Sequence, residues 1–169
     1  MRNALILLPV VALAVAGFGA SAAGKPASAH VTAAAAAKRT VVKTRHGSLG
    51  TFLVDGRGRT LYRFLKDTSK KSHCSGQCAT FWPPLLTSGK PAAQGGAKAS
   101  MLSTTRRSNG ARQVTYNGRP LYHFSGDSKA GDTNGEGLNA FGARWYVVST
   151  AGNVIKSSTA AAPPSNNGY

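Results

Sequence analysis

The sequence predicts an all-β domain, either an antiparallel sandwich or a partly closed barrel, assembled from two pseudo-symmetric hairpin repeats. The first observation is an internal repeat: residues 58–67 (GRTLYRFLKD) align with residues 118–127 (GRPLYHFSGD) at a constant offset of 60, with six identities in ten positions. The second is that each copy follows a turn signal, Asp55-Gly56 or Asn117-Gly118, which itself follows a β-favouring run. The third is that nothing in the domain sustains a helical period over ten residues.

Seven stretches have the composition of strands. They are residues 40–45, 50–54, 61–65, 112–116, 121–125, 144–149 and 153–156. Successive side chains of a strand point to opposite faces of the sheet. Tyr62 and Phe64 therefore lie on one face of their strand, and Leu61, Arg63 and Leu65 lie on the other.

The repeated motif has the form Tyr-x-Phe-x-x-Asp, and its simplest interpretation is structural. We expect each ring pair to face the core and each Asp to follow the end of its strand, where it accepts backbone N–H groups in a local Asx-type turn. The alternative is a Tyr and Asp pair that contacts a ligand in each half. The motif residues are Tyr62, Phe64 and Asp67 in the first copy and Tyr122, Phe124 and Asp127 in the second.

The N-terminal segment 1–23 is typical of a secretory signal peptide, with a positive charge at Arg2, then an apolar run and small residues. The rest of the chain divides into an Ala-rich linker over 24–39, the two-repeat domain over 40–157 and a disordered tail over 158–169. No cysteine lies near the cleavage site. We therefore expect a secreted, extracytoplasmic protein that is not lipid-anchored and has no membrane span after cleavage.

The charge of the chain favours an anionic partner. There are 21 Lys and Arg residues against five Asp and Glu residues, a formal net charge of +16. Specific nucleic-acid binding is not expected, because Arg59 and Arg63 lie on the opposite face from Tyr62 and Phe64, so charges and rings do not share one surface. We expect a non-enzymatic module of the cell envelope, without a cofactor, that associates with an anionic cell-wall polymer or surface.

A family resemblance rests on four pieces of sequence. The two copies LYRFLKD and LYHFSGD, the intervening HCSGQCATFWPPL and the following GARQVTYNGRPLY resemble the secreted-repeat family of predicted bacterial lipoproteins with the Tyr-x-(Phe/Trp/Tyr)-x-x-Asp motif. The resemblance covers essentially the whole domain. It implies an envelope or secreted location and an all-β repeat domain, and it carries no assigned activity. The chain departs from the lipoprotein form because it lacks a cysteine that could be acylated at the signal cut.

The two cysteines, Cys74 and Cys78, allow two interpretations. Export favours a disulfide between them, and a loop this short gains only about 2 kcal/mol from closure, so the bridge would mainly shape the loop. The alternative is a metal- or redox-linked extracytoplasmic protein in which His73, Cys74, Cys78 and His123 bind copper(I) or zinc. Against it, the cysteine spacing is not the Cys-x-x-Cys that zinc sites commonly use.

Two further patterns offer weaker chemistry. The oxygen-bearing residues Asp127, Asp132, Asn134 and Glu136 fall in a Gly-rich loop, but they lack the full signature of a calcium loop and are typical of a solvated turn. The run Ser72-His73-Cys74 has a faint likeness to cell-wall transpeptidases, but its flanking residues differ and a second cysteine would lock the nucleophile in a disulfide. No catalytic residue is therefore predicted.

Overall fold

The computed structural model describes residues 39–156. The predicted signal peptide (1–23), the predicted tail (158–169) and nearly all of the predicted linker (24–39) lie outside the described residues. Within the described part of the chain, no helix is both long enough and apolar enough to cross a membrane.

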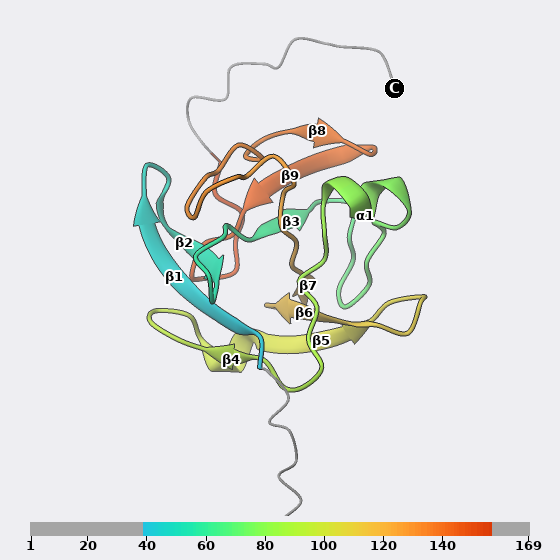
Figure 1. Ribbon diagram of the computed structural model, residues 1–169, viewed down its shortest axis with the longest axis horizontal. Helices are drawn as coiled ribbons and strands as arrows, with labels where there is room; N and C mark the ends of the chain where they lie inside the picture. The colour runs from blue at the N-terminus through green and yellow to red at the C-terminus, as the bar shows by residue number, and fades with distance from the viewer. Residues whose placement is uncertain (1–38, 157–169) are drawn as a thin grey trace, which may run out of the picture. The chain divides into compact units, whose positions relative to one another are not determined.

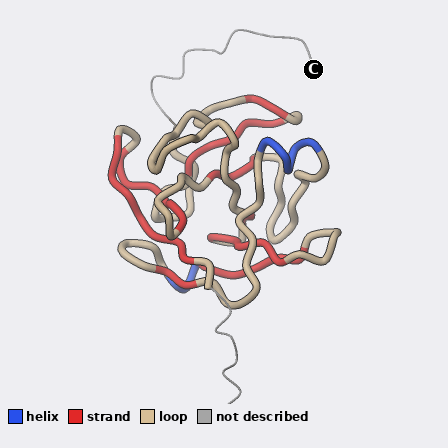
Figure 2. The backbone as a smooth tube through the Cα atoms, viewed as in Figure 1, coloured by secondary structure: helices blue, strands red, loops and turns tan. Residues whose placement is uncertain are grey.

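The described residues are mostly strand and loop, with one short helix (Figures 1 and 2). The elements in chain order are β1 (Val41–Gly47), β2 (Gly50–Asp55), β3 (Tyr62–Phe64), α1 (Gln77–Phe81), β4 (Ala92–Ala93), the 3-10 turn η1 (Ala99–Met101), β5 (Leu102–Arg106), β6 (Arg112–Tyr116), β7 (Arg119–Pro120), β8 (Asn139–Ala140) and β9 (Ala143–Val147). The all-β class predicted from the sequence is confirmed.

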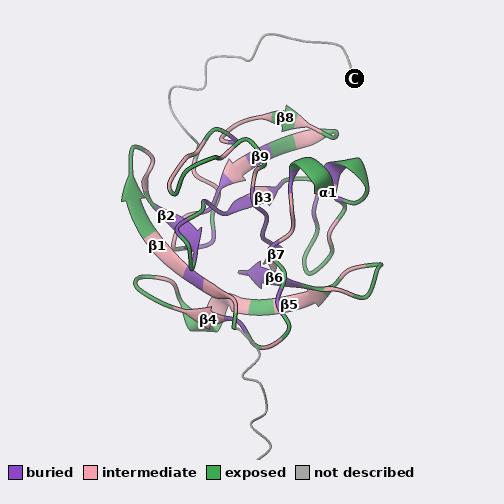
Figure 3. Cartoon of the chain, in the orientation of Figure 1, coloured by how far each residue is buried: buried purple, intermediate pink, exposed green. Residues whose placement is uncertain are grey.

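The strands form three small sheets, in the orders β2-β1-β4, β3-β9-β8 and β5-β6-β7. All pairings within them are antiparallel except that of β1 with β4. No closed barrel forms among the described residues, so the sandwich-like alternative is the one observed. In Figure 3 the buried segments β2, β3 and β6 lie inside, and β1 and β5, which are more exposed, curve around them.

The two repeats interlock at a backbone pair between their motif tyrosines. Tyr62 N donates to Tyr122 O at 2.8 Å, and Tyr122 N donates back to Tyr62 O at 3.0 Å. On one side, β3 of the first repeat pairs with β9, which follows the second motif. On the other side, the second motif pairs with the segment after the first, since His123 N donates to Pro83 O at 2.8 Å. Each motif strand is therefore completed by the other repeat.

Two clusters of buried side chains lie on opposite faces of the interlocked strands. Phe52, Val54, Tyr62 and Phe64 belong to an aromatic cluster together with both tryptophans. Leu53 and its neighbours belong to an aliphatic cluster, whose buried members are Val42, Leu53, Leu61, Leu85, Val114, Tyr116, Leu121 and Val148. Because β2 and the motif strands are covered on both faces, alternate side chains are buried in different clusters.

Two predicted strands form only isolated bridges. Residues 121–125 make only isolated bridges through Tyr122, and residues 153–156 make only one, between Val154 and Val148. The first case has a direct cause, because the partner segment contains Pro83 and Pro84, which have no backbone N–H to donate to a ladder. Conversely, β4, β5, β7, β8 and α1 were not predicted; β5 is largely polar (LSTTR), and the others have two to five residues.

The turn between β6 and β7 has the predicted chemistry. Asn117 and Gly118 both have positive φ, 49° and 73°, as a two-residue type I′ hairpin turn requires. Asn tolerates this left-handed conformation, whereas β-branched residues do not.

Replacing Asn117 separates backbone strain from side-chain contacts. Asn117→Val should lower the free energy of unfolding by about 1–2 kcal/mol, because a β-branched residue is strained at positive φ. Asn117→Gly is the matched control and should stay within about 0.5 kcal/mol of wild type. Urea denaturation monitored by tryptophan fluorescence provides the measurement, and equal stability of the two variants would contradict the assigned turn.

Candidate functional site

The motif tyrosines and aspartates are bonded across the repeats. Tyr62 Oη donates to Asp127 Oδ2 at 2.7 Å, and Tyr122 Oη donates to Asp67 Oδ2 at 2.6 Å. Each copy of the motif therefore contributes the tyrosine of one pair and the aspartate of the other. This pairing was not predicted, because each partner lies in the other copy.

The second oxygen of each motif aspartate closes a loop rather than a local turn. Asp67 Oδ1 accepts His73 N at 2.7 Å, and Asp127 Oδ1 accepts Asn134 N at 3.0 Å. These donors lie six and seven residues downstream, so the predicted Asx-type turn is wrong. A carboxylate with two oxygens can hold the loop and the distant tyrosine together, which a local turn would not achieve.

Burial governs the protonation of these groups. Desolvation raises the pKa of Asp67 above its ordinary value, and the hydrogen bonds from Tyr122 and His73 N only partly offset it. Burial likewise raises the pKa of Asp127. The pKa of each motif tyrosine is raised by burial and by the aspartate to which it is bonded. Tyr62 and Tyr122 are fully buried. The tyrosine hydroxyls thus remain protonated donors at neutral pH and have no contact with solvent.

The motif phenylalanines are the ends of a stack of four rings. Phe64 stacks on Trp145 at 4.1 Å between ring centroids, Trp145 on Trp82 at 3.9 Å, and Trp82 on Phe124 at 4.4 Å. Each motif phenylalanine therefore packs on the tryptophan that follows the other copy. The edges of the motif tyrosines meet the same indoles. This arrangement places all six motif residues in one connected core.

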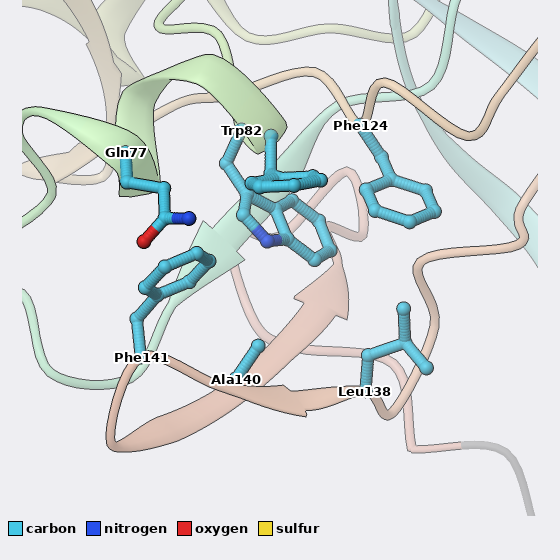
Figure 4. Close-up of a pocket in the computed structure, with 7 residues that line it drawn as sticks. Gln77, Trp82, Phe124, Leu138, Ala140 and Phe141 are labelled. Carbon is cyan, nitrogen blue, oxygen red and sulfur yellow. The ribbon is translucent and has the colours of Figure 1, made fainter. Parts of the chain in front are cut away.

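The two ends of the stack differ. Phe64 is fully buried, whereas Phe124 is half-buried and lines a cavity of about 320 Å³. The cavity is lined by Gln77, Phe81, Trp82, Phe124, Leu138, Ala140 and Phe141 (Figure 4). Of these, Phe124 is a motif residue, and Phe81 and Trp82 belong to the segment after the cysteines. Phe141 gave no signal, because it follows a Gly-rich loop without a recognisable pattern.

A second, basic cleft lies beside the first hairpin. It has a volume of about 570 Å³, and its basic lining consists of Arg39, Arg57, Arg59 and His123. Among its lining residues, Asp55 Oδ2 lies 3.1 Å from His123 Nε2 and 2.9 Å from the Arg59 guanidinium. Burial alone would raise the pKa of Asp55, but the hydrogen bonds from His123 and Arg59 outweigh burial and hold it well below its usual range.

The cysteines form the predicted disulfide, Cys74–Cys78, and its loop leads into α1. Of the alternative metal ligands, His123 bonds Asp55 and His73 Nδ1 lies 3.9 Å from Asp67. Across residues 39–156, no three His, Cys, Asp or Glu side chains are grouped so that they could hold a metal ion. The structure thus does not assemble His73, Cys74, Cys78 and His123 into a site.

The acidic side chains of the Gly-rich loop accept hydrogen bonds from the loop backbone and from strand β9. Asp132 Oδ2 accepts Ser128 N at 3.0 Å and Lys129 N at 2.8 Å, and Glu136 Oε2 accepts Val147 N at 2.7 Å. These contacts agree with the interpretation of the acidic cluster as a turn.

The fold and its motif define a class of protein: an all-β domain of two tandem repeats locked together by exchanged strands and reciprocal Tyr and Asp pairs. A lipoprotein family described as a secreted repeat of unknown function matches residues 43–86 and 103–149, more than half of the chain, and the chain belongs to it. Membership agrees with the resemblance found in the sequence and supports an extracytoplasmic location. No curated protein and no solved structure matches the chain.

The cross-repeat pairs can be tested by a double-mutant cycle. Tyr122→Phe should lower the free energy of unfolding by about 1–3 kcal/mol, because it leaves the buried Asp67 carboxylate without one of its donors. Combining it with Asp67→Asn should cost clearly less than the sum of the single losses, as expected for directly bonded groups. Tyr146→Phe is the control, since its ring is only half-buried. Additive losses at Tyr122 and Asp67 would contradict the pair.

Asp55 should make the fold sensitive to acid. Its pKa is lowered in the folded state relative to 3.8, so its contribution to stability is complete above about pH 4 and is lost as the pH falls below that value. Asp55→Asn should therefore flatten the loss of stability between about pH 4 and about pH 2. Asp67→Asn has the opposite sign, because the folded pKa of Asp67 is raised and its protonation favours folding. Denaturant midpoints across this pH range provide the test; a profile for Asp55→Asn parallel to wild type would count against the cluster.

Proposed function

We propose that the protein is a non-enzymatic module of the cell envelope that binds anionic surface polymers through its exposed lysine and arginine side chains. The observation that carries this proposal is that the carboxylates bond within the protein, while most Lys and Arg side chains are exposed. None of the five acidic residues of the chain is exposed, and all of them bond within the protein. The internal partners are Arg59 and His123 for Asp55, Tyr122 for Asp67, Tyr62 for Asp127, the Ser128 and Lys129 amides for Asp132, and the Val147 amide for Glu136.

The exposed charge is therefore almost entirely positive. Fourteen Lys and Arg residues of the described part are exposed: Arg39, Arg45, Arg57, Arg59, Lys66, Lys70, Lys71, Lys90, Lys98, Arg106, Arg112, Lys129, Arg144 and Lys156. A surface with one sign of charge attracts polyanions over a distance of about the Debye length. An extracytoplasmic protein meets such polymers in the cell wall.

The basic cleft offers three arginines and a histidine in one concave place. Arg39 and Arg57 are exposed and make no ion pair with Asp55, whereas Arg59 and His123 both pair with it. Pro83, Pro84 and Leu86 supply an apolar wall. A phosphate or carboxylate group entering the cleft would find cationic donors and a surface that excludes part of the surrounding water, which strengthens each charged contact.

Non-enzymatic action is supported by the absence of an activated group in the places the sequence suggested. Cys74 and Cys78 are joined to each other, and so neither is a thiolate nucleophile. The motif tyrosines and Asp67 are buried and bonded to each other across the repeats. Their roles in the fold account for the motif without a reacting substrate.

Binding should depend strongly on salt. Purified protein mixed with bacterial cell walls rich in anionic polymers should sediment with them at low ionic strength and should be released as salt rises, because exposed charges are screened. Walls chemically stripped of their anionic polymers are the matched control and should retain much less protein. If the protein stays in the supernatant at low salt, or is retained equally by stripped walls, the proposal is wrong.

Two variants of equal charge locate the contact. Arg39→Ser with Arg57→Ser removes two charges from the cleft, and Lys90→Ser with Arg106→Ser removes two exposed charges elsewhere. The cleft variant should be released at a distinctly lower salt concentration than the control. Equal release would show that polymer binding is spread over the surface and does not centre on the cleft.

A further inference from the structure

The cavity at the open end of the ring stack is chemically unlike the rest of the surface. In a chain with 21 Lys and Arg residues, its lining contains no ionisable side chain. Two of the large apolar side chains that are exposed in the described chain, Phe81 at 46% and Phe141 at 37%, lie beside each other at this cavity, with ring centroids 6.1 Å apart. An uncharged, aromatic-lined cavity of this volume is typical of a site for a small molecule.

Phe141 is placed at the cavity by a strained turn. β8 and β9 are joined by Phe141 and Gly142, with φ of 57° and 85°, the geometry of a two-residue type I′ turn. That turn favours Asn or Gly at its first position, and a bulky residue there is destabilised by about 1–2 kcal/mol. Strain of this kind recurs where a side chain contacts a ligand. The strained position holds a ring over the cavity, where Figure 4 shows it opposite Trp82.

The cavity also contains a hydrogen-bond donor. Both faces of the Trp82 indole are covered by Trp145 and Phe124, so it presents an edge to the cavity, and its nitrogen lies on that side in Figure 4. The corresponding nitrogen of Trp145 donates to Ala140 O at 3.2 Å. Within residues 39–156 no acceptor receives the Trp82 N–H. The Gln77 amide is the other polar group of the lining.

We propose that this cavity binds one small, uncharged aromatic molecule whose hydrogen-bond acceptor takes the Trp82 N–H, with the ring held between Phe81, Phe141 and Leu138. The site goes beyond the proposed polymer binding and does not depend on it. An anionic ligand would find no cation here, and the volume is at the lower end for small-molecule sites, which favours a compact ring system. Apolar contact provides the affinity, and the indole N–H fixes the orientation.

The uncharged aromatic ketone Prodan is a suitable probe, because its emission shifts to the blue in apolar surroundings. Titration of the protein should show saturable binding of one dye per chain that changes little with salt. Phe141→Asn removes the ring and suits the turn, and Ala140→Leu fills the cavity; each should weaken binding about tenfold. Leu65→Asn is the matched control, since Leu65 is 43% exposed and does not line the cavity.

Wild-type affinity in both Phe141→Asn and Ala140→Leu would overturn the proposal, as would an equal loss in Leu65→Asn. The donor is tested separately by NMR of the two indole N–H resonances. On addition of Prodan the Trp82 resonance should move downfield further than that of Trp145, whose N–H is already bonded. An unmoved Trp82 resonance would overturn the assigned orientation. Because Prodan is uncharged, its binding and the salt-dependent retention on cell walls can fail independently.

Discussion

The exchange of backbone hydrogen bonds between Tyr62 and Tyr122 is the constraint on which the rest of the structure depends. It sets the two motif strands against each other in opposite directions, so that each tyrosine hydroxyl reaches the aspartate of the other copy. The spacing Tyr-x-Phe-x-x-Asp then has a physical reason. Tyrosine and phenylalanine share a face because they are two residues apart, and three further residues bring the carboxylate around to the partner repeat. Because each repeat supplies half of every pair, a single repeat would leave buried polar groups without partners.

Local signals in the sequence predicted the local structure. The constant offset of 60 and the two turn signals gave both hairpins, and β6 has the predicted bounds. Residues 121–125 fall short of a full strand because their partner contains Pro83 and Pro84, a relationship that no local pattern contains. The cross-repeat role of Asp67 and the position of Phe141 also depend on contacts between distant segments. Residue composition alone does not encode such contacts, although the pseudo-symmetry of the repeat offered a hint of the first.

Stability and surface charge are coupled in this fold. The hydrogen bonds that hold Asp67, Asp127 and Glu136 in place also withdraw their negative charge from the surface. Asp55 in addition forms ion pairs with Arg59 and His123, and all three residues line the basic cleft. A protein that used carboxylates on its exterior for solubility would cancel part of its own attraction for polyanions. Here the carboxyl groups are bonded within the fold, and the cationic exterior is the result.

The differences between the repeats are where binding is to be sought. Phe64 ends the ring stack in the closed core, whereas its counterpart Phe124 ends it at a cavity. The copies also differ at the residue between the motif tyrosine and phenylalanine. It is Arg63 in the first copy and His123, which pairs with Asp55, in the second. The motif residues that the two copies share build the core. A feature present in one copy only is not required by the reciprocal pairing, so that pairing explains neither the open cavity nor the basic cleft.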